Sequence, residues 1–479
     1  MTTPRLHPET GDAVTSPSMR SRRGAQLLSK VLTDSPQLLT GRYAGYRRAV
    51  LEVAMAGLVA ADPGAATHRC VSYDPATDVL TVDGHRYELK GVGRVLVVGA
   101  GKASYPIAAA LQEILQSRLA GGVVAVRDPD APALVGIQVM CADHPLPTER
   151  SVRAAEQILT CAADAGPDDV VITCFTGGSS ALSSLPVEGV GANDKRTLHE
   201  QLLSSGLAIT DINAVRKQVS AIKGGRVALA ALPARIINLT VSDVAGSPLD
   251  AITDPTVQDT SDAAQARAVL QQAELWNLVP SSVRAHLERN LPTPELVVEP
   301  QTVMLADGAR TAKAMQRAAT DLGYHSVLVE REIEGDADEV GEYVARRALD
   351  EAEAQAAPVM LLGCGGESVV TLGSGAAFGQ GGPNQHAALR AAQTLAGHAS
   401  AAIFVDTDGS DGGTPYAGAL VDGATWRRSQ QRGVDLQLAR LQHSSTTACE
   451  QLGLAVRMGH TGTNVNDLFV VLAAPEVEA

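Results

Sequence analysis

Residues 94–104, RVLVVGAGKAS, decide the fold class of the N-terminal part of the chain. A run of β-branched residues leads into a glycine turn, and residues 102–116 then have a helix-like pattern. Further short apolar runs alternate with alanine-rich helical stretches. This alternation predicts an α/β fold, a parallel sheet with helices on both faces. The further strand candidates are 121–128, 137–143, 169–175 and 234–243.

Composition indicates an ordinary soluble globular protein. The 479 residues are 45% hydrophobic and 19% charged, which suggests two or three domains. A net charge of −14 argues against general binding to nucleic acid or to an anionic membrane. No apolar run reaches the roughly 18 residues of a membrane span, and the six scattered cysteines contain no C-x-x-C pair. We therefore expect a cytoplasmic protein with reduced thiols, without a membrane or nucleic-acid partner.

Proline-rich sequence between about 275 and 300 divides the chain. Strand-like runs resume beyond it, for example at 358–364 and 466–473. The predicted organisation is a disordered leader at 1–24, an N-terminal domain at 25–290 and a separate α/β or α+β unit at 291–479.

The turn that ends the first strand, VVGAGKAS, offers Gly101, Lys102 and Ser104. It is not a P-loop, because the first glycine position holds Leu96 and Ala103 follows the lysine. It is a partial dinucleotide fingerprint, with Asp128 ending the next strand. Three interpretations stay open: a dinucleotide site, a tight turn with a solvated lysine, or a cation for a phosphate or carboxylate.

Two further features lie in the same half of the chain. The stretch FTGGSSALSSLP (175–186) follows another strand, and its N–H groups and hydroxyls suit a carboxylate or phosphate, although helix capping explains it equally well. His144 orients a ligand, acts as a base, or is a hydrogen-bonded structural histidine. The candidate residues of the loop are Gly177, Gly178, Ser179 and Ser180.

INAVRKQVSAIKGGRVA (212–228) is the most cationic stretch. As one helix it places Arg216, Ser220 and Lys223 on one face, opposite an apolar face. In an acidic protein this row, with Lys217, is a candidate anion clamp. The alternative is a solvated face whose charges complement the helix C-terminus.

Carboxylates follow two other strand-like runs. Asp243 ends the run at 234–243, and Asp406, Asp408 and Asp411 lie in DTDGSDGG. An EF-hand is excluded because the twelfth loop position is Ala417. The acidic turns are candidate Mg²⁺ ligands, with ordinary Asp-Gly turns as the alternative.

GQGGPNQHAAL (379–389) has the form of a glycine turn that opens a helix. Gly381, Gly382 and the N–H groups from Asn384 onward could cradle an anion, whereas Pro383 has no N–H and suits the first helical turn. Asn464 and Asn466, before the last apolar run, form either a site edge or a hydrogen-bonded turn.

Eight of these blocks, in this order, resemble the class II glycerate 2-kinases of the MOFRL family. The resemblance spans about residues 25–472 and implies a Rossmann-like N-terminal domain, a smaller C-terminal α/β domain, and an active site in the cleft between them. It implies transfer of the γ-phosphoryl of ATP, with Mg²⁺, to the 2-hydroxyl of D-glycerate. The blocks are GAGKAS, DHPLPTERSVRAAEQIL, TGGSSALSSLP, INAVRKQVSAIKGGRVA, SDVAGSPLDAITDPTVQD, GGESVV, DTDGSDGGTPYAGALVD and HTGTNVNDL.

The resemblance also assigns roles to residues. It implies catalytic roles for Lys102, Arg216 and Asp243, and metal binding by Asp243, Asp406, Asp408 and Asp411. Substrate or phosphate binding falls to the remaining candidates: Gly101, Ser104, His144, Gly177, Gly178, Ser179, Ser180, Lys217, Lys223, Gly381, Gly382, Asn384, Asn464 and Asn466.

Three site segments depart from the family pattern. Where the family has Gly-Gly-Arg-Asn-Gln-Glu, this chain has Pro383 and His386 in place of the arginine and the glutamate. Asp-Val-Pro-Gly-Asp has become DVAGS (243–247), and Ser-Gly-Pro-Thr has become TDPT (253–256). These changes suggest a diverged member with another hydroxy-acid acceptor. The alternatives are an NAD(P)-dependent hydroxypyruvate reductase and a family member that binds without turnover; assembly stays open, with a homodimer as one option.

Overall fold

The computed structural model describes residues 22–90, 93–242, 249, 254–329, 334–371 and 378–476. The predicted leader falls almost entirely outside these residues. The chain divides into two compact units. Unit 2 comprises residues 62–306 and 462–464, and unit 1 comprises 1–61, 307–461 and 465–479.

Unit 2 is built on a six-stranded parallel sheet, which confirms the predicted α/β class. Its spatial order is β6-β5-β4-β7-β8-β9. If β4 to β9 are numbered 1 to 6, this order is 3-2-1-4-5-6, which is the order of the Rossmann fold. The prediction of a doubly wound fold is therefore correct. The strands are β4 (Val95–Ala100), β5 (Leu119–Val126), β6 (Gln138–Cys141), β7 (Val170–Phe175), β8 (Arg235–Val241) and β9 (Gln301–Ala306).

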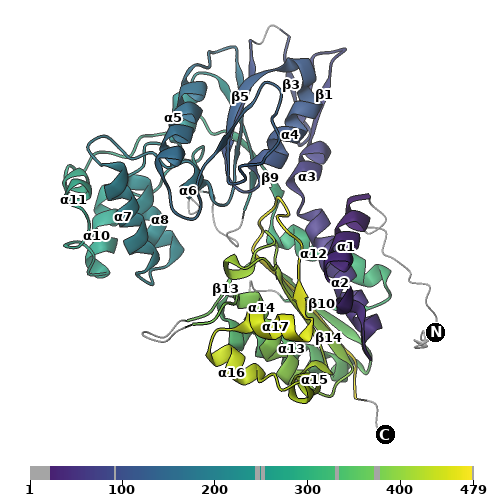
Figure 1. Ribbon diagram of the computed structural model, residues 1–479. Coiled ribbons are helices and arrows are strands. Elements are labelled where there is room, and N and C mark those ends of the chain that lie inside the picture. The colour runs from purple at the N-terminus through teal and green to yellow at the C-terminus, as the bar shows by residue number, and fades with distance from the viewer. Residues whose placement is uncertain are drawn as a thin grey trace. The chain divides into compact units, whose positions relative to one another are not determined.

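Helices cover both faces of this sheet (Figure 1). Alternate strand residues such as Leu96 and Val98 pack against Ala154 and Ile158 of α5 (Glu149–Ala163), beside α9 (Arg226–Ala231). The other face carries α3 (Pro63–Cys70), α4 (Ser104–Leu115) and η3 (Gln116–Arg118). A small antiparallel meander, which was not predicted from the sequence, consists of β1 (Val71–Asp74), β2 (Val79–Val82) and β3 (His85–Glu88).

Four helices between β7 and β9 form a separate layer with its own apolar cluster (Figure 1). They are α7 (Ala192–Leu203), α8 (Ile209–Gln218), α10 (Ala263–Gln272) and α11 (Ser281–Glu288); the short α6 (Ser179–Leu182) precedes them. The prediction of a single helix from Ile212 to a stop at Gly224 and Gly225 is wrong. α8 ends at Gln218, because the Ser220 hydroxyl then accepts the N–H groups of Ile222 and Lys223 and closes a turn.

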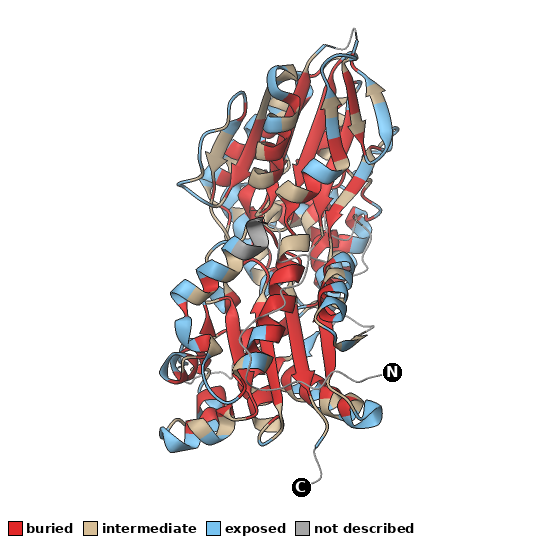
Figure 2. Cartoon of the chain, turned by 90° about the vertical axis from the view of Figure 1, so that its right-hand side faces the viewer, coloured by how far each residue is buried: buried red, intermediate tan, exposed pale blue. Residues whose placement is uncertain are grey.

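Unit 1 contains a mixed six-stranded sheet of order β10-β12-β17-β14-β15-β16, in which only β10 and β12 pair in parallel among its described strands. Except for β10, whose residues are exposed or half-buried, its strands are almost entirely buried and are drawn in red in Figure 2. The strands are β10 (His325–Leu328), β12 (Val359–Cys364), β14 (Ser400–Asp406), β15 (Gly418–Asp422), β16 (Ala455–Val456) and β17 (Asp467–Ala473); β11 (Gly335–Asp336) and β13 (Ser368–Val369) form a separate pair.

Two layers of helices enclose the sheet of unit 1. Alanine-rich faces of α13 (Ala337–Gln355) and α14 (Pro383–Thr394) pack on one side. α2 (Ala44–Ala60) and α12 (Gly308–Asp321) contact each other and the other side. The remaining elements are α1 (Arg22–Asp34), η2 (Pro36–Leu39), η4 (Asp411–Gly413), α15 (Thr425–Gln431), α16 (Leu436–Leu441) and α17 (Ser445–Leu452).

The units differ from the predicted domain limits at both ends. β9 lies beyond the predicted boundary at 290, yet it pairs with β8 and so completes the first sheet. The proline-rich stretch therefore leads into β9 rather than out of the unit. At the other end, α2 belongs to unit 1, because residues such as Val50 and Met55 are fully buried there.

Among the described residues, no single helix has the length and apolar composition of a membrane span. α2 and α3 pass that test only as a pair, and they are bent by 52° at the break between them.

A buried ion pair ties α2 to β15. Arg47 Nε lies 2.6 Å from Asp422 Oδ2, and both side chains are fully buried. We predict that Arg47→Met lowers the free energy of unfolding by about 3–5 kcal/mol, because Asp422 is left buried without its partner. Chemical denaturation should show this loss, whereas Arg427→Met on the exposed face of α15 should change stability by less than about 1 kcal/mol. Equal effects of the two substitutions would contradict the burial of this pair.

Candidate active site

The turns that follow β4 and β7 meet at the point where the strand order of unit 2 reverses. Lys102 N–H donates to the Gly177 carbonyl at 2.9 Å, and Ala103 N–H donates to Thr176 Oγ1 at 3.1 Å. Ligands of doubly wound folds bind at this switch point, outside the carboxyl ends of the strands. The fold therefore puts the predicted Lys102 turn and the glycine–serine loop in one place.

Gly101 and Ser104 serve the packing of these turns. Gly101 has a φ of +142°, and a Cβ there would lie 2.1 Å from Thr176 Oγ1. Ser104 is fully buried and donates its hydroxyl to the Cys174 carbonyl at 2.7 Å. The structure thus gives the Ser104 side chain a partner inside the fold rather than the predicted ligand contact.

Lys102 and His144 flank Gly178. A Cβ on Gly178, whose φ is +86°, would lie 3.4 Å from Lys102 Cγ and 3.3 Å from the His144 ring. His144 is positioned just ahead of α5, which begins with a capping box formed by Thr148 and Ser151. Three residues predicted separately from sequence therefore lie side by side. The Ser179 N–H bonds to the Thr176 carbonyl, so this residue closes the turn.

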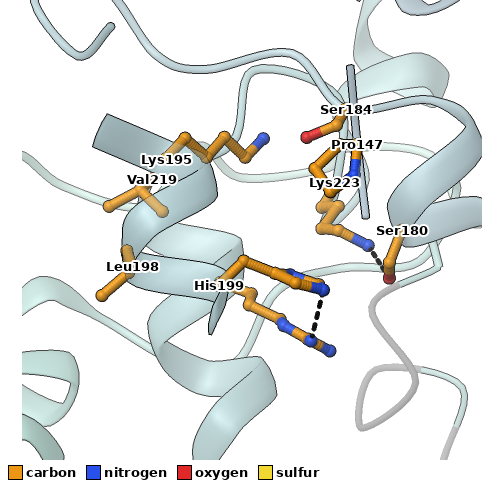
Figure 3. Close-up of a pocket in the computed structure, with 9 residues that line it drawn as sticks. Pro147, Ser180, Ser184, Lys195, Leu198, His199, Val219 and Lys223 are labelled. Atoms are coloured by element: carbon orange, nitrogen blue, oxygen red, sulfur yellow. Dashed lines mark hydrogen bonds between the residues drawn. The ribbon is translucent and has the colours of Figure 1, made fainter. Parts of the chain in front are cut away.

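A basic pocket lies between the glycine–serine loop and the helical layer (Figure 3). α7 contributes Lys195 and His199, α8 contributes Arg216, and the turn after α8 contributes Lys223. Pro147, Ser180, Ser184, Leu198 and Val219 complete the lining, which has no carboxylate among the residues that the structure describes.

Neutral oxygen and nitrogen atoms accept hydrogen bonds from these cations. Lys223 Nζ donates to Ser180 Oγ, and Lys195 Nζ donates to the Leu185 carbonyl at 2.6 Å. Lys195 Nζ also lies 3.3 Å from Ser220 Oγ. Arg216 bonds to His199 Nε2 and Asn213 Oδ1, both at 3.2 Å. Within the described part of the chain, its buried Nε has no hydrogen-bond partner.

Burial and mutual repulsion lower the pKa values of these groups. Desolvation, followed by the charges of Arg226 and Arg216, lowers the pKa of Lys195 to about 7. Desolvation also lowers the pKa of Lys223 well below its usual value. His199, buried beside the same cations, has its pKa lowered to about 3 and is neutral. An anion in the pocket would relieve this repulsion.

Local sequence patterns did not indicate Lys195, His199 or Ser184. Lys195 and His199 are four residues apart and therefore share a helix face, but that signal resembles any polar helix surface. Lys217, in contrast, was predicted to bind a ligand. It instead forms a buried ion pair with Asp259 at 2.8 Å, inside the helical layer.

The anion cradle predicted at the start of α14 already holds an internal carboxylate. Asp411 is buried and accepts the N–H groups of Asn384 at 3.0 Å and Gln385 at 2.8 Å. Gly382 leaves room for it, because a Cβ there would lie 2.2 Å from Asp411 Cγ. The prediction of free N–H groups for an external anion at Asn384 is therefore wrong.

The acidic turn forms no metal cage among the described residues. Asp406 accepts the N–H of Asp408, and Asp408 accepts the N–H of Ser410. The amide of Asn384 bonds to Asp467. The remaining candidates are placed as follows: Gly381 packs against Ser445, Asn466 accepts hydrogen bonds from Thr407 through its carbonyl, Asn464 is buried, and Asp243 lies outside the described residues.

The fold and site define a Rossmann-type protein with a basic pocket at its switch point. Residues 49–288 match a domain of unknown function, DUF4147, and residues 359–467 match the MOFRL family. The chain is 34% identical over 423 residues to glycerate 2-kinase of Pyrococcus horikoshii, covering 86% of this chain and 94% of that one. The chain belongs to the MOFRL-type glycerate kinase family.

Two other known proteins are similar to this chain. A relative from Agrobacterium vitis, provisionally named a hydroxypyruvate reductase, is 38% identical over 79% of this chain and 87% of its own length. The solved structure of glycerate kinase from Thermotoga maritima is 28% identical, with a TM-score of 0.75 over 88% of this chain and 98% of that one.

We predict that Asp411→Ala destabilises the protein by about 2–4 kcal/mol, because buried N–H donors at the start of α14 lose their acceptor. Asp435→Ala is the matched control. Asp435 also caps a helix by accepting two N–H groups, but it is exposed, so water replaces it and the cost stays near 1 kcal/mol. Chemical denaturation of both variants measures the difference; equal costs would show that Asp411 is not a buried cap.

Proposed function

We propose that this protein is an ATP-dependent kinase of the glycerate 2-kinase type, which phosphorylates a hydroxyl of a small hydroxy acid. The observation that carries the proposal is that Lys102 and His144 flank Gly178 at the switch point of the sheet, two residues before Ser180, which lines the basic pocket. Phosphoryl transfer needs positioned cations more than covalent chemistry by the protein. The family assignment supports the same reaction.

In this proposal the substrate hydroxyl oxygen bonds to the γ-phosphorus of ATP while the bond to the β–γ bridging oxygen breaks. Lys102 neutralises charge on the transferring group. His144, beside it, takes the hydroxyl proton. ADP and the phosphorylated acid are the products.

We propose that Mg²⁺ binds together with the phosphates of ATP. Asp411 does not fit a metal ligand, since its two oxygens already accept hydrogen bonds from Asn384 and Gln385. One or two carboxylates are enough when phosphate oxygens supply the other ligands. Asp406, Asp408 and Asp243 stay proposed ligands of that kind.

We expect Lys102→Met to lower kcat/KM by a factor on the order of 10²–10³, because a cation at the transferring group is lost. The assay is ADP release with Mg·ATP over a panel of hydroxy acids that includes D-glycerate, with phosphorus NMR to locate the new ester. Lys90→Met removes an exposed lysine of the same unit and should leave the rate unchanged.

The same assay separates the rival functions. Oxidation of a nicotinamide cofactor by hydroxypyruvate, without ADP release, would contradict the kinase proposal and indicate a reductase. Mg·ATP binding by calorimetry, without product from any acid, would indicate a member that binds without turnover. The six free cysteines support a cytoplasmic location, and light scattering tests the proposed homodimer.

Pro383 is our reason to propose an acceptor other than glycerate. The family resemblance puts an arginine at this position, and proline here keeps the first turn of α14. Pro383→Arg should raise kcat/KM for D-glycerate by about tenfold or more, the value of a charge-assisted hydrogen bond. Pro383→Ala controls for loss of the proline ring. Glycerate turnover by the unchanged protein at rates typical of the family would contradict the altered acceptor.

A further inference from the structure

We propose that Lys195, Arg216 and Lys223 form an oxyanion subsite, which holds a carboxylate or phosphate group of the small-molecule substrate. The inference rests on the proposed function and names the recognition element of that same site.

Convergence of three cations from separate segments is the first argument. Lys195 lies on α7, Arg216 on α8 and Lys223 in the following turn, and all three line one pocket with Ser180 and Ser184. Figure 3 shows Lys195 and Lys223 directed toward the serine side of the pocket. A chance cluster on a solvated surface would not bury its ammonium groups, yet Lys195 is 8% exposed and Lys223 is 3% exposed.

Unused hydrogen-bonding capacity is the second argument. The buried Arg216 Nε has no partner among the described residues, although burial of an unsatisfied charged donor is costly. The acceptors of Lys195 Nζ are a carbonyl and a hydroxyl, neither of which carries charge. An oxyanion would supply both the missing acceptor and the missing negative charge.

Neighbouring charges do not cancel the cations. Arg216 and Arg226 act on Lys195 from α8 and α9, and His199 is held neutral on α7. Asp254 attracts Lys223, but Arg216, Lys195 and Lys217 repel it. Asp259 is already paired with Lys217. Among the residues that the structure describes, positive charge therefore dominates around the pocket.

This geometry has a measurable consequence. Burial lowers the pKa of Lys195 to about 7, so the lysine is largely neutral at pH 8. A bound anion favours the charged form and raises that pKa, so binding takes up a proton at pH 8. At pH 6 Lys195 is already protonated and contributes no uptake.

The first test uses the unaltered protein, so it does not depend on whether a variant folds. D-Glycerate and sulfate are titrated by calorimetry in Tris and in HEPES, at pH 8 and at pH 6, with chloride as the control. Sulfate supplies tetrahedral oxyanion chemistry without titrating in this range. We expect binding with more proton uptake at pH 8 than at pH 6, because Lys195 contributes to the uptake only at the higher pH. Absence of binding by both anions, or binding with the same proton count at both pH values, would overturn the proposal.

The second test compares Lys195→Met with Arg196→Met, which removes an exposed cation one residue away. Lys195→Met should weaken anion binding by about tenfold or more, through loss of one charge-assisted contact. A rise confined to the KM of the acid indicates a carboxylate in the subsite; a rise confined to the KM of ATP indicates a phosphate. An equal effect of both substitutions contradicts the subsite.

The proposed function and the subsite fail in different ways. Unchanged affinity and KM values in folded Lys195→Met, with kinase activity intact, overturn the subsite and leave the kinase standing. Anion binding with proton uptake, without phosphoryl transfer to any acid, overturns the kinase and supports the subsite.

Discussion

The close approach of two turns at the switch point of unit 2 is the constraint on which the site depends. A Cβ on Gly99 would lie 2.3 Å from the Cys174 carbonyl oxygen, and one on Gly101 would meet Thr176. Only glycine lets the ends of β4 and β7 come this close. Because they touch, Lys102 is fixed beside Gly178 and His144, and the residues after β7 open toward the helical layer.

The helical layer then brings cations to the same place at an electrostatic cost. The drop in the Lys195 pKa from its usual 10.5 to about 7 corresponds to roughly 5 kcal/mol against the charged form. The apolar cluster under α7, α8, α10 and α11 holds these residues in position regardless. Burying like charges without function is unfavourable, and such perturbed groups in a cavity are typical of functional sites.

Local patterns predicted most strands of the Rossmann sheet because they are short apolar runs, which are buried throughout in β4 and β7. They could not predict that β9 belongs to this sheet, because it follows a proline-rich stretch. They also could not predict the unit in which α2 packs, because its apolar face would fit either core. The site divides in the same way. Lys102, His144 and Gly178 stood out by residue type, whereas Lys195 and His199 are identified only by what surrounds them. Likewise, no local sequence pattern indicates that Lys217 pairs with Asp259 whereas Lys223 donates a hydrogen bond to Ser180.

The two departures at the start of α14 have become parts of the fold. Pro383 occupies the first helical turn, where no N–H is needed, and Asp411 satisfies the donors that follow it. His386 Nε2 lies 3.0 Å from Asp338, which also binds Arg440. A position where the family has a glutamate thus supports an internal pair with a carboxylate. Both replacements are therefore accommodated by contacts within the described part of the chain, and the charge that binds substrate has to come from other residues.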